Sequence, residues 1–300
     1  MKRRFLCFAA CLLCAFCSWA ETYEPHVKAV VERILSNVEK IRAVDPSCVP
    51  MAFWDFDGTI IRGDIGFGLV ENGAVRYRGL IEEALEAGFV KTYACVGGCR
   101  QWRTDYARMA EIGPWLSQAY DAQMFAGVRA AELDAFCEKT IRKKRLTDWY
   151  FASSVAIWRA LAGAGVENYI LSANVEALVR NVASTLDIPR ERIRGSRVEC
   201  EDGCWTVRFV PPVPHGDGKT ALLREIVRNR PHGRAVAAFG NSYATDGAFL
   251  RFVAGLSLPG AASGTAVMIN GGNPPACFDG AFICVRQDAV VKALNVAETN

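Results

Sequence analysis

Two acidic residues, one position apart, are the part of this sequence that most clearly offers chemistry. Asp55 and Asp57 follow the apolar run 49–53, which is typical of a buried strand, and Gly58 and Thr59 come next. Unpaired carboxylates at the end of a buried strand are costly to desolvate, so they need a cation or a proton between them. A metal ion with a phosphoryl group meets that need, because one acid attacks phosphorus, the metal neutralises charge and the second acid handles a proton.

Four other polar residues occupy comparable places later in the chain. Ser172 and Asn241 each end an apolar run, and Asp246 lies five residues after Asn241. In an open parallel sheet, functional side chains gather where the strands end at their carboxyl edge. Lys219 opens a helical pattern after a glycine-rich turn, where a cation and free backbone N–H groups suit a phosphate. Each residue alone has an ordinary interpretation: a helix cap, a turn residue or a surface lysine.

In order and placement these residues resemble the four motifs of the haloacid dehalogenase superfamily, over about residues 49–260. The resemblance implies that Asp55 is the nucleophile and forms an aspartyl-phosphate, while Asp57 is the general acid/base. It also implies that Ser172 hydrogen-bonds the phosphoryl group and that Lys219 pairs with Asp55 and the phosphoryl oxygens. Ala173 and Asn174, directly after Ser172, are further candidates for substrate binding.

The resemblance further implies a Mg²⁺ site. Its ligands would be Asp55, the backbone carbonyl of Asp57, Asn241 and Asp246. At the position of Asn241 this family usually has an aspartate, and an asparagine there offers a carbonyl oxygen without a charge. We therefore expect weakened magnesium affinity with activity retained.

Substrate preference is suggested by one acid in the segment after the first motif. This segment resembles the cap of the phosphoserine phosphatase-like branch, which includes secreted phosphorylcholine phosphatases, and there an acid nine residues past the nucleophile contacts the substrate's ammonium group. That position is Asp64 here. Aromatic faces could complete a cation site, although aromatic residues at helical spacing are commonly core and Asp64 could simply cap a helix. The candidate rings are Trp102, Tyr106, Trp115 and Tyr120.

The pattern of elements predicts an α/β protein with a doubly wound, Rossmann-like parallel sheet and an inserted all-helical cap. The cap is expected at 60–147 and the core at 21–59 and 148–300. Outside the cap, helices are predicted at 21–41, 150–162, 175–186, 218–230, 246–252 and 287–297, and strands at 49–53, 168–171, 235–239, 255–258, 266–269 and 282–285, with a hairpin at 197–209.

Composition suits a globular enzyme. The 300 residues are 51% hydrophobic and 22% charged, and the net charge of +3 is too small to indicate a nucleic-acid partner. A basic head, a short apolar stretch and small residues before position 21 are typical of a secretory signal peptide cleaved after Ala20, so we expect a periplasmic or secreted protein with no transmembrane span in the mature chain. A lipid anchor on one of the cysteines in this stretch is a less favoured alternative.

Eight cysteines follow the signal segment, an even number that suggests disulfides in an exported chain. Local pairs flank short turns, whereas the spacings argue only weakly for zinc, and free buried thiols are the alternative. The candidate pairs are Cys95 with Cys99, Cys200 with Cys204, and Cys277 with Cys284.

These observations together predict an exported, Mg²⁺-dependent phosphomonoesterase that acts on a small phosphate ester. The substrate hypothesis is an ester that bears an ammonium group: phosphocholine, phosphoethanolamine or phosphoserine. One alternative is a nucleotidase or a broad-specificity phosphatase of the same superfamily. Another, of a different class, is an exported binding protein with a degenerate site, for which Asn241 is the support.

Overall fold

A six-stranded parallel sheet forms the centre of the protein, whose computed structural model describes residues 25–291. The strand order β12-β11-β8-β1-β4-β5 places β1 between β8 and β4. This confirms the predicted doubly wound α/β fold. The strands are β1 (Val49–Trp54), β4 (Glu167–Val175), β5 (Ile193–Ser196), β8 (Gly233–Gly240), β11 (Thr265–Ile269) and β12 (Ile283–Val285).

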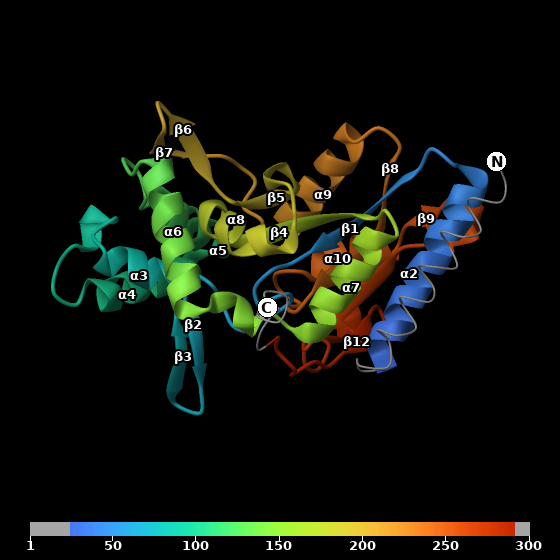
Figure 1. The fold of residues 1–300 in the computed structure, drawn as a ribbon, viewed down its shortest axis with the longest axis horizontal. Coiled ribbons are helices and arrows are strands. Elements are labelled where there is room, and N and C mark those ends of the chain that lie inside the picture. Colours follow the sequence, from blue (N-terminus) through green and yellow to red (C-terminus); the bar gives the residue numbers. More distant parts are fainter. Residues whose placement is uncertain (1–24, 292–300) are drawn as a thin grey trace, which may run out of the picture.

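Helices cover both faces of this sheet (Figure 1). Successive β1 side chains alternate between two apolar clusters, as a strand buried on both faces requires: Ala52 and Trp54 belong to one, Met51 and Phe53 to the other. The helices α2 (Pro25–Val44), α7 (Ala152–Gly163) and α8 (Glu176–Ala183) pack in the first cluster, and α9 (Asp217–Asn229) and α10 (Gly247–Ala254) pack in the second.

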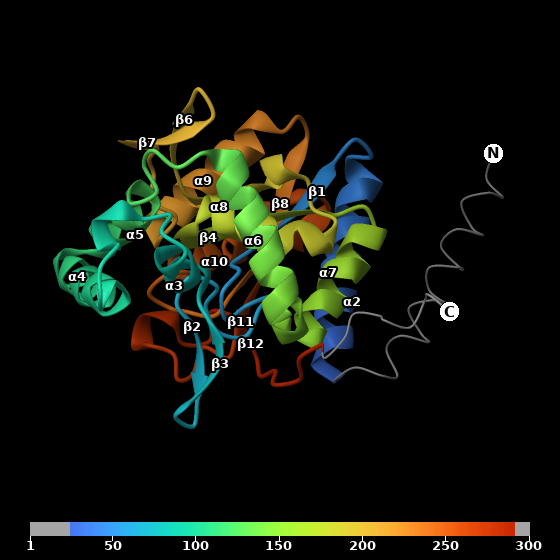
Figure 2. The same ribbon diagram turned by 60° about the vertical axis from the view of Figure 1, so that its left-hand side comes forward.

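A largely helical block follows β1 and lies to the left of the sheet in Figure 1; in Figure 2 part of this block has come forward and lies in front of the sheet. It begins with a hairpin of β2 (Gly68–Glu71) and β3 (Ala74–Arg78), so the prediction of an all-helical segment was wrong there. Asn72 and Gly73 form the two-residue loop with positive φ angles of 51° and 76°, which these residue types tolerate. The block continues with α3 (Leu80–Glu86), η1 (Lys91–Tyr93), α4 (Gly98–Ile112), α5 (Pro114–Gln123), α6 (Ala130–Lys144) and η2 (Leu146–Trp149).

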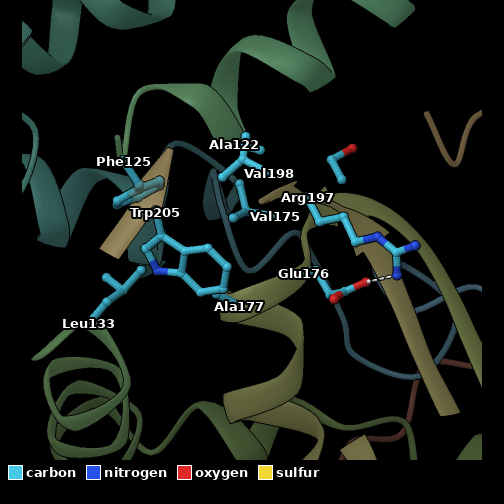
Figure 3. Close-up of a pocket in the computed structure, with 10 residues that line it drawn as sticks. Ala122, Phe125, Leu133, Val175, Glu176, Ala177, Arg197, Val198 and Trp205 are labelled. Carbon is cyan, nitrogen blue, oxygen red and sulfur yellow. Dashed lines mark ion pairs between the residues drawn. The ribbon is translucent and has the colours of Figure 1, made fainter. Parts of the chain in front are cut away.

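The predicted hairpin around residues 202–203 is present as β6 (Val198–Glu201) and β7 (Cys204–Phe209). It contacts the helical block through its backbone, because Gly127 N donates to Trp205 O at 2.7 Å and Trp205 N donates to Val128 O at 2.9 Å. Figure 3 shows the Trp205 ring beside Phe125 and Leu133 in the apolar pocket at this junction. The hairpin therefore joins the core to the helical block at a second place.

The predicted C-terminal helix is wrong over residues 287–291. This segment is extended, pairs Val290 with Phe151 and takes part in tertiary hydrogen bonds that replace those of a helix. The rest of that prediction, and the predicted signal segment 1–20, lie outside the described residues. Within residues 25–291, no helix is long and apolar enough to cross a membrane. Two further short strands are β9 (Ser257–Leu258) and β10 (Ala262–Ser263). The remaining short 3₁₀ helices are η3 (Ser184–Leu186), η4 (Arg190–Arg192), η5 (Pro259–Ala261) and η6 (Ala276–Phe278).

The predicted disulfides are not formed: all eight cysteines of the described chain are free. In the β6–β7 hairpin the register pairs Cys200 with Trp205 and Glu201 with Cys204, so the two sulfur-bearing residues do not face each other across the strands.

Candidate active site

The predicted site residues converge at the carboxyl edge of the three central strands. Asp55 directly follows β1, and its backbone N–H donates to Phe239 O of β8 at 2.8 Å. Ser172 lies on β4 and Asn241 follows β8, so the neighbouring strands carry the other polar groups. This is the edge at which doubly wound sheets bind ligands.

Lys219 joins two of the predicted acids. Its Nζ lies 2.6 Å from Asp55 Oδ1 and 2.6 Å from Asp246 Oδ1. The ammonium group and the Asp246 side chain are fully buried, and Asp55 is 5% exposed. The second oxygen of Asp55 accepts a hydrogen bond from Thr59 Oγ1 at 2.8 Å. Two carboxylates with one lysine leave the ionised cluster with an excess negative charge, which a cation or a proton must balance.

The two acids of the first motif differ in ionisation. Burial, with the charge of Asp246, raises the pKa of Asp55 to about 6, while Lys219 opposes the rise. Burial raises the pKa of Asp57 well above its usual range, and the charges of Asp64 and Asp55 raise it further. Asp57 therefore holds its proton to a higher pH than an ordinary aspartate, which is the state a general acid needs.

Asn241 packs directly on the first motif. A Cβ atom added at Gly58 would collide with the Asn241 amide group, so the glycine lets the two segments approach. The backbone N–H groups of Asn241 and Ser242 donate to Asp246 Oδ2 at 2.9 and 3.0 Å, while the other oxygen, Oδ1, contacts Lys219. Both oxygens of the Asp246 carboxylate are therefore held in place. The carboxylates of Asp55 and Asp246 with the Asn241 amide make an oxygen-rich set.

A match to the sequence model of one protein family shows which family the chain belongs to. The model for haloacid dehalogenase-like hydrolases matches residues 52–251, which include the site just described. The chain belongs to this family. It is therefore a haloacid dehalogenase-like hydrolase, as the order of its motifs indicated, and the alternation of strands and helices described above is the scaffold of that family's site.

Two solved structures, given first below, show the same fold at low sequence identity. A protein of unknown function from Bordetella pertussis Tohama I has a TM-score of 0.59 and 14% identity, covering 79% of this chain and 98% of its own. A functionally unknown protein from Anaerococcus prevotii DSM 20548 has a TM-score of 0.53 and 13% identity, covering 83% and 90%. A phosphoserine phosphatase with a phospho-aspartyl intermediate analogue has a TM-score of 0.44 and 15% identity, covering 79% and 93%. No curated protein matches the chain in sequence.

Three of the predicted substrate-binding residues of this hydrolase, Ser172, Ala173 and Asn174, lie on β4. Ser172 Oγ is 3.4 Å from Asp57 Oδ2, and Asn174 Nδ2 is 3.3 Å from the same oxygen. Asp57 Oδ1 accepts a hydrogen bond from Ile65 N at 2.7 Å. Ala173 lies between the two, and its carbonyl oxygen accepts a hydrogen bond from Ser196 Oγ at 2.7 Å. Ser172 and Asn174 therefore hold the Asp57 carboxylate in place.

Asp64 is connected to Asp57 through Asn174. Asn174 Nδ2 donates to Asp64 Oδ1 at 3.0 Å, and the backbone N–H groups of Gly66 and Phe67 donate to the same oxygen at 2.7 and 2.9 Å. The latter two bonds fix the turn before β2, so Asp64 has a structural role at a turn and not at the helix start considered from the sequence. The bond to Asn174 links Asp64 to Asp57, because the same amide nitrogen contacts both carboxylates. Burial raises the pKa of Asp64 in spite of these hydrogen bonds.

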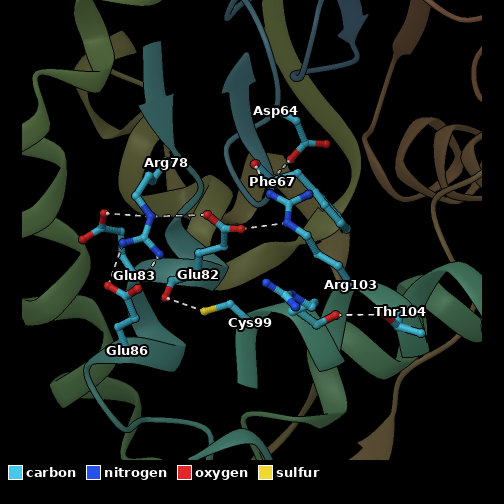
Figure 4. Close-up of polar contacts among 10 residues, drawn as sticks. Asp64, Phe67, Arg78, Glu82, Glu83, Glu86, Cys99, Arg103 and Thr104 are labelled. Carbon is cyan, nitrogen blue, oxygen red and sulfur yellow. Dashed lines mark hydrogen bonds and ion pairs between the residues drawn. The ribbon is translucent and has the colours of Figure 1, made fainter. Parts of the chain in front are cut away.

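An aromatic cluster lies next to Asp64. The Phe67 ring centroid is 4.7 Å from those of Trp102 and Tyr106. The Arg103 guanidinium lies over the Phe67 and Trp102 rings, at 5.4 and 5.5 Å from the centroids. It also donates to Phe67 O at 2.8 Å, and Figure 4 shows Arg103 beside Phe67. Two of the predicted rings, Trp102 and Tyr106, therefore pack on Phe67, whose backbone N–H bonds Asp64, and Trp102 is fully buried. These faces already hold one cation, the guanidinium.

The other two predicted rings have different surroundings. Trp115 is 60% exposed, and Tyr120 Oη is hydrogen-bonded to Tyr93 Oη at 2.7 Å. Phe67 was missed from the sequence because nothing distinguishes it from a core residue.

A buried acid in the cap, Asp121, was also missed. It accepts a hydrogen bond from Trp102 Nε1 at 2.9 Å and is 3% exposed. Burial raises its pKa to about 8; the Trp102 bond opposes this rise and the charge of Asp64 adds to it. An aspartate within a helical pattern gives no signal of this kind in the sequence.

We expect Asp121→Asn to stabilise the protein increasingly as pH rises. Between about pH 4 and 8 the unfolded chain ionises Asp121 while the folded protein keeps the proton, so wild-type stability falls with rising pH. Asparagine keeps an acceptor for Trp102 and does not titrate. Urea unfolding at pH 5 and pH 8 should show a larger difference between variant and wild type at pH 8. A difference that does not change with pH would contradict the assignment.

Proposed function

We propose that this hydrolase is a phosphomonoesterase that works through an aspartyl-phosphate on Asp55. The observation that carries the proposal is the Lys219 Nζ contact of 2.6 Å to both Asp55 and Asp246, beside Asp57. A site that only binds an anion does not need a carboxylate beside that anion, because the two negative charges repel each other. Phosphate release from p-nitrophenyl phosphate tests the proposal, and its absence from the purified protein under all metal conditions would overturn it.

In this proposal the acids divide the chemistry. Lys219 screens the negative ester so that the ionised Asp55 approaches phosphorus in line, and the hydroxyl of Ser172 binds a phosphoryl oxygen. Asp57 gives its proton to the leaving alcohol and then accepts one from the water that hydrolyses the aspartyl-phosphate. The proton that Asp57 loses to the alcohol is replaced by the proton that it takes from water, so Asp57 ends the cycle protonated.

We propose that Mg²⁺ binds to the carboxylates of Asp55 and Asp246, the amide oxygen of Asn241 and the backbone carbonyl of Asp57. Among residues 25–291 no three His, Cys, Asp or Glu side chains are grouped to hold a metal, so the set depends on amide and backbone oxygens. Magnesium prefers such oxygen ligands and completes its shell with water or substrate oxygens. When bound, the ion neutralises charge on the phosphoryl group.

Asn241→Asp should lower the Mg²⁺ concentration that gives half-maximal activity by about tenfold, since a ligand charge contributes on the order of 1.4 kcal/mol to binding a divalent cation at a partly solvated site. Magnesium titrations of both proteins after removal of metal with EDTA measure the effect. If added magnesium never stimulates phosphate release by the wild type, the metal site is wrong.

We also propose that the substrate carries an ammonium group, which favours phosphocholine, phosphoethanolamine or phosphoserine over a nucleotide. The half-buried Asp64 bonds the Phe67 N–H and the buried Asp121 bonds the Trp102 indole, so both acids contact residues of the Phe67, Trp102 and Tyr106 cluster. Carboxylates with aromatic faces suit such a cation. Arg103 would have to yield part of these faces to the substrate. A nucleotidase or a broad-specificity phosphatase stays the alternative, and preference for nucleoside monophosphates in a substrate panel would favour it.

Asp64→Asn tests the ammonium site. We expect kcat/KM for phosphocholine to fall about 10- to 100-fold, because the lost charge interacts with a desolvated cation, while kcat/KM for p-nitrophenyl phosphate changes less than threefold. The amide keeps the size of the side chain and an acceptor oxygen for Gly66 and Phe67. Equal losses on the charged and uncharged esters would show that Asp64 only shapes the turn.

We propose finally that the protein is exported, as the N-terminal sequence predicts. The fate of that segment is tested by mass spectrometry of the protein recovered from the cell envelope and medium, with a mature N-terminus at Glu21 expected. A cytoplasmic protein that retains Met1 would overturn it, and a lipid-modified cysteine would favour the anchored alternative.

A further inference from the structure

The position of Asp55 depends on Thr59. One carboxylate oxygen of Asp55 contacts Lys219, and the other accepts the Thr59 Oγ1 hydrogen bond at 2.8 Å. Thr59 is fully buried in the loop that follows the first motif. Any shift of the Thr59 backbone therefore moves the hydroxyl that fixes the orientation of the Asp55 carboxylate.

Two buried side chains hold the Thr59 backbone. Ser154 Oγ donates to the Thr59 carbonyl at 2.6 Å, and Gln287 Nε2 donates to the same oxygen at 3.2 Å. The two also bond to each other, since Gln287 Nε2 donates to Ser154 Oγ at 2.8 Å. Ser154 is fully buried and Gln287 is 3% exposed. Buried polar groups that satisfy one another in this way fix a single local arrangement.

Gln287 comes from the C-terminal segment, beyond the residues 52–251 that the family model matches. Its backbone is fixed by Asn270: Gln287 N donates to Asn270 Oδ1 at 2.9 Å, and Asn270 Nδ2 donates to Gln287 O at 2.8 Å. Further along, Ala152 N donates to Ala289 O and Val291 N to Tyr150 O, at 2.9 and 2.7 Å. The segment thus stays in place by its backbone, independently of the Gln287 side chain.

We propose that Gln287 is a positioning residue for the reaction, acting on Asp55 through Thr59. The inference rests on the proposed role of Asp55 as nucleophile. Without the Gln287 amide, the Thr59 carbonyl keeps only the Ser154 hydroxyl, which has itself lost a partner. Small displacements of a nucleophile reduce the rate of an in-line attack strongly, by up to about 10²-fold for 1 Å.

Gln287→Ala and Gln287→Met test the proposal, the second because methionine fills nearly the same volume without an amide. With p-nitrophenyl phosphate and saturating Mg²⁺, we expect kcat to fall about 10- to 100-fold in both while KM changes less than threefold. The matched control is Asn37→Ala, which removes a buried amide on α2 that bonds Ser263 O at 2.8 Å and Thr265 Oγ1 at 3.4 Å. It should lower the thermal midpoint comparably and leave kcat within about twofold of wild type, since no catalytic group contacts it.

The outcomes separate the two proposals. If wild type releases phosphate and Asp55→Asn does not, while both Gln287 variants keep the wild-type kcat, only the positioning role is overturned. An equal fall in kcat in Asn37→Ala would also overturn it, since general destabilisation then explains the loss. If Asp55→Asn retains activity, the nucleophile assignment fails and the positioning role fails with it.

Discussion

Asp55→Asn is expected to reduce phosphate release to below about 10⁻⁴ of the wild-type kcat, a loss typical of removing a nucleophile. Asparagine keeps the shape of the side chain and an acceptor for Thr59 or Lys219, but its amide does not form a phosphoryl ester. Steady-state rates with p-nitrophenyl phosphate at saturating Mg²⁺ measure the effect.

The fold should survive this change. Removing one of two carboxylates around Lys219 lowers the excess negative charge of the buried cluster, so the free energy of unfolding in EDTA should stay near the wild-type value or rise. The control is Asp134→Asn, the same chemical change at a partly buried acid that bonds Asn181 and Arg190, and it should keep kcat within about twofold. Activity above one per cent in a folded Asp55→Asn protein would contradict the assignment.

Lys219→Met should reduce both activity and stability. Without the ammonium group, Asp55 and Asp246 are two buried carboxylates that face each other unpaired, and loss of one partner of a buried ion pair costs about 3–5 kcal/mol. Phosphate release should fall at least about 10³-fold, because the lysine also screens the ester. Urea unfolding in EDTA measures the loss of stability.

Two further proteins separate charge from packing in this test. Lys219→Met combined with Asp246→Asn should recover part of the lost stability, since one of the unpaired charges is gone. Lys143→Met, at an exposed lysine of α6, should change the free energy of unfolding by less than about 0.5 kcal/mol. If Lys219→Met is as stable as wild type, the lysine does not hold the two acids in solution as the structure describes.

That the predicted site residues lie at one edge of the sheet follows from topology. Asp55 follows β1, Ser172 lies on β4 and Asn241 follows β8, and neighbouring parallel strands bring their carboxyl ends to the same edge. Lys219 could also be placed there from the sequence, because it lies in the first turn of a predicted helix that begins at the same edge of the sheet. The hairpin at 68–78 was predictable too, because Asn72-Gly73 is a turn signal, but the helical pattern around it was given more weight.

Side-chain contacts between distant segments were not predictable. Trp102 and Trp115 look alike in the sequence, yet only the first lies in the cluster around Phe67. Gln287 was assigned to a helix from its local sequence pattern. Its hydrogen bonds to Asn270 and to the Thr59 carbonyl join segments that are distant in the sequence, so no local pattern indicates them. Local pattern fixes neither contact, since both depend on tertiary packing of segments far apart in the chain.

The central claim is that an oxygen of Asp55 becomes bonded to phosphorus in each cycle. A crystal structure of the protein with Mg²⁺ and beryllium fluoride, an analogue of the acyl phosphate, tests this most directly. We expect beryllium bonded to Asp55 with its fluorides held by Lys219 and Ser172. A fluoride adduct on another residue, or none at Asp55 in crystals of active protein, would contradict the account.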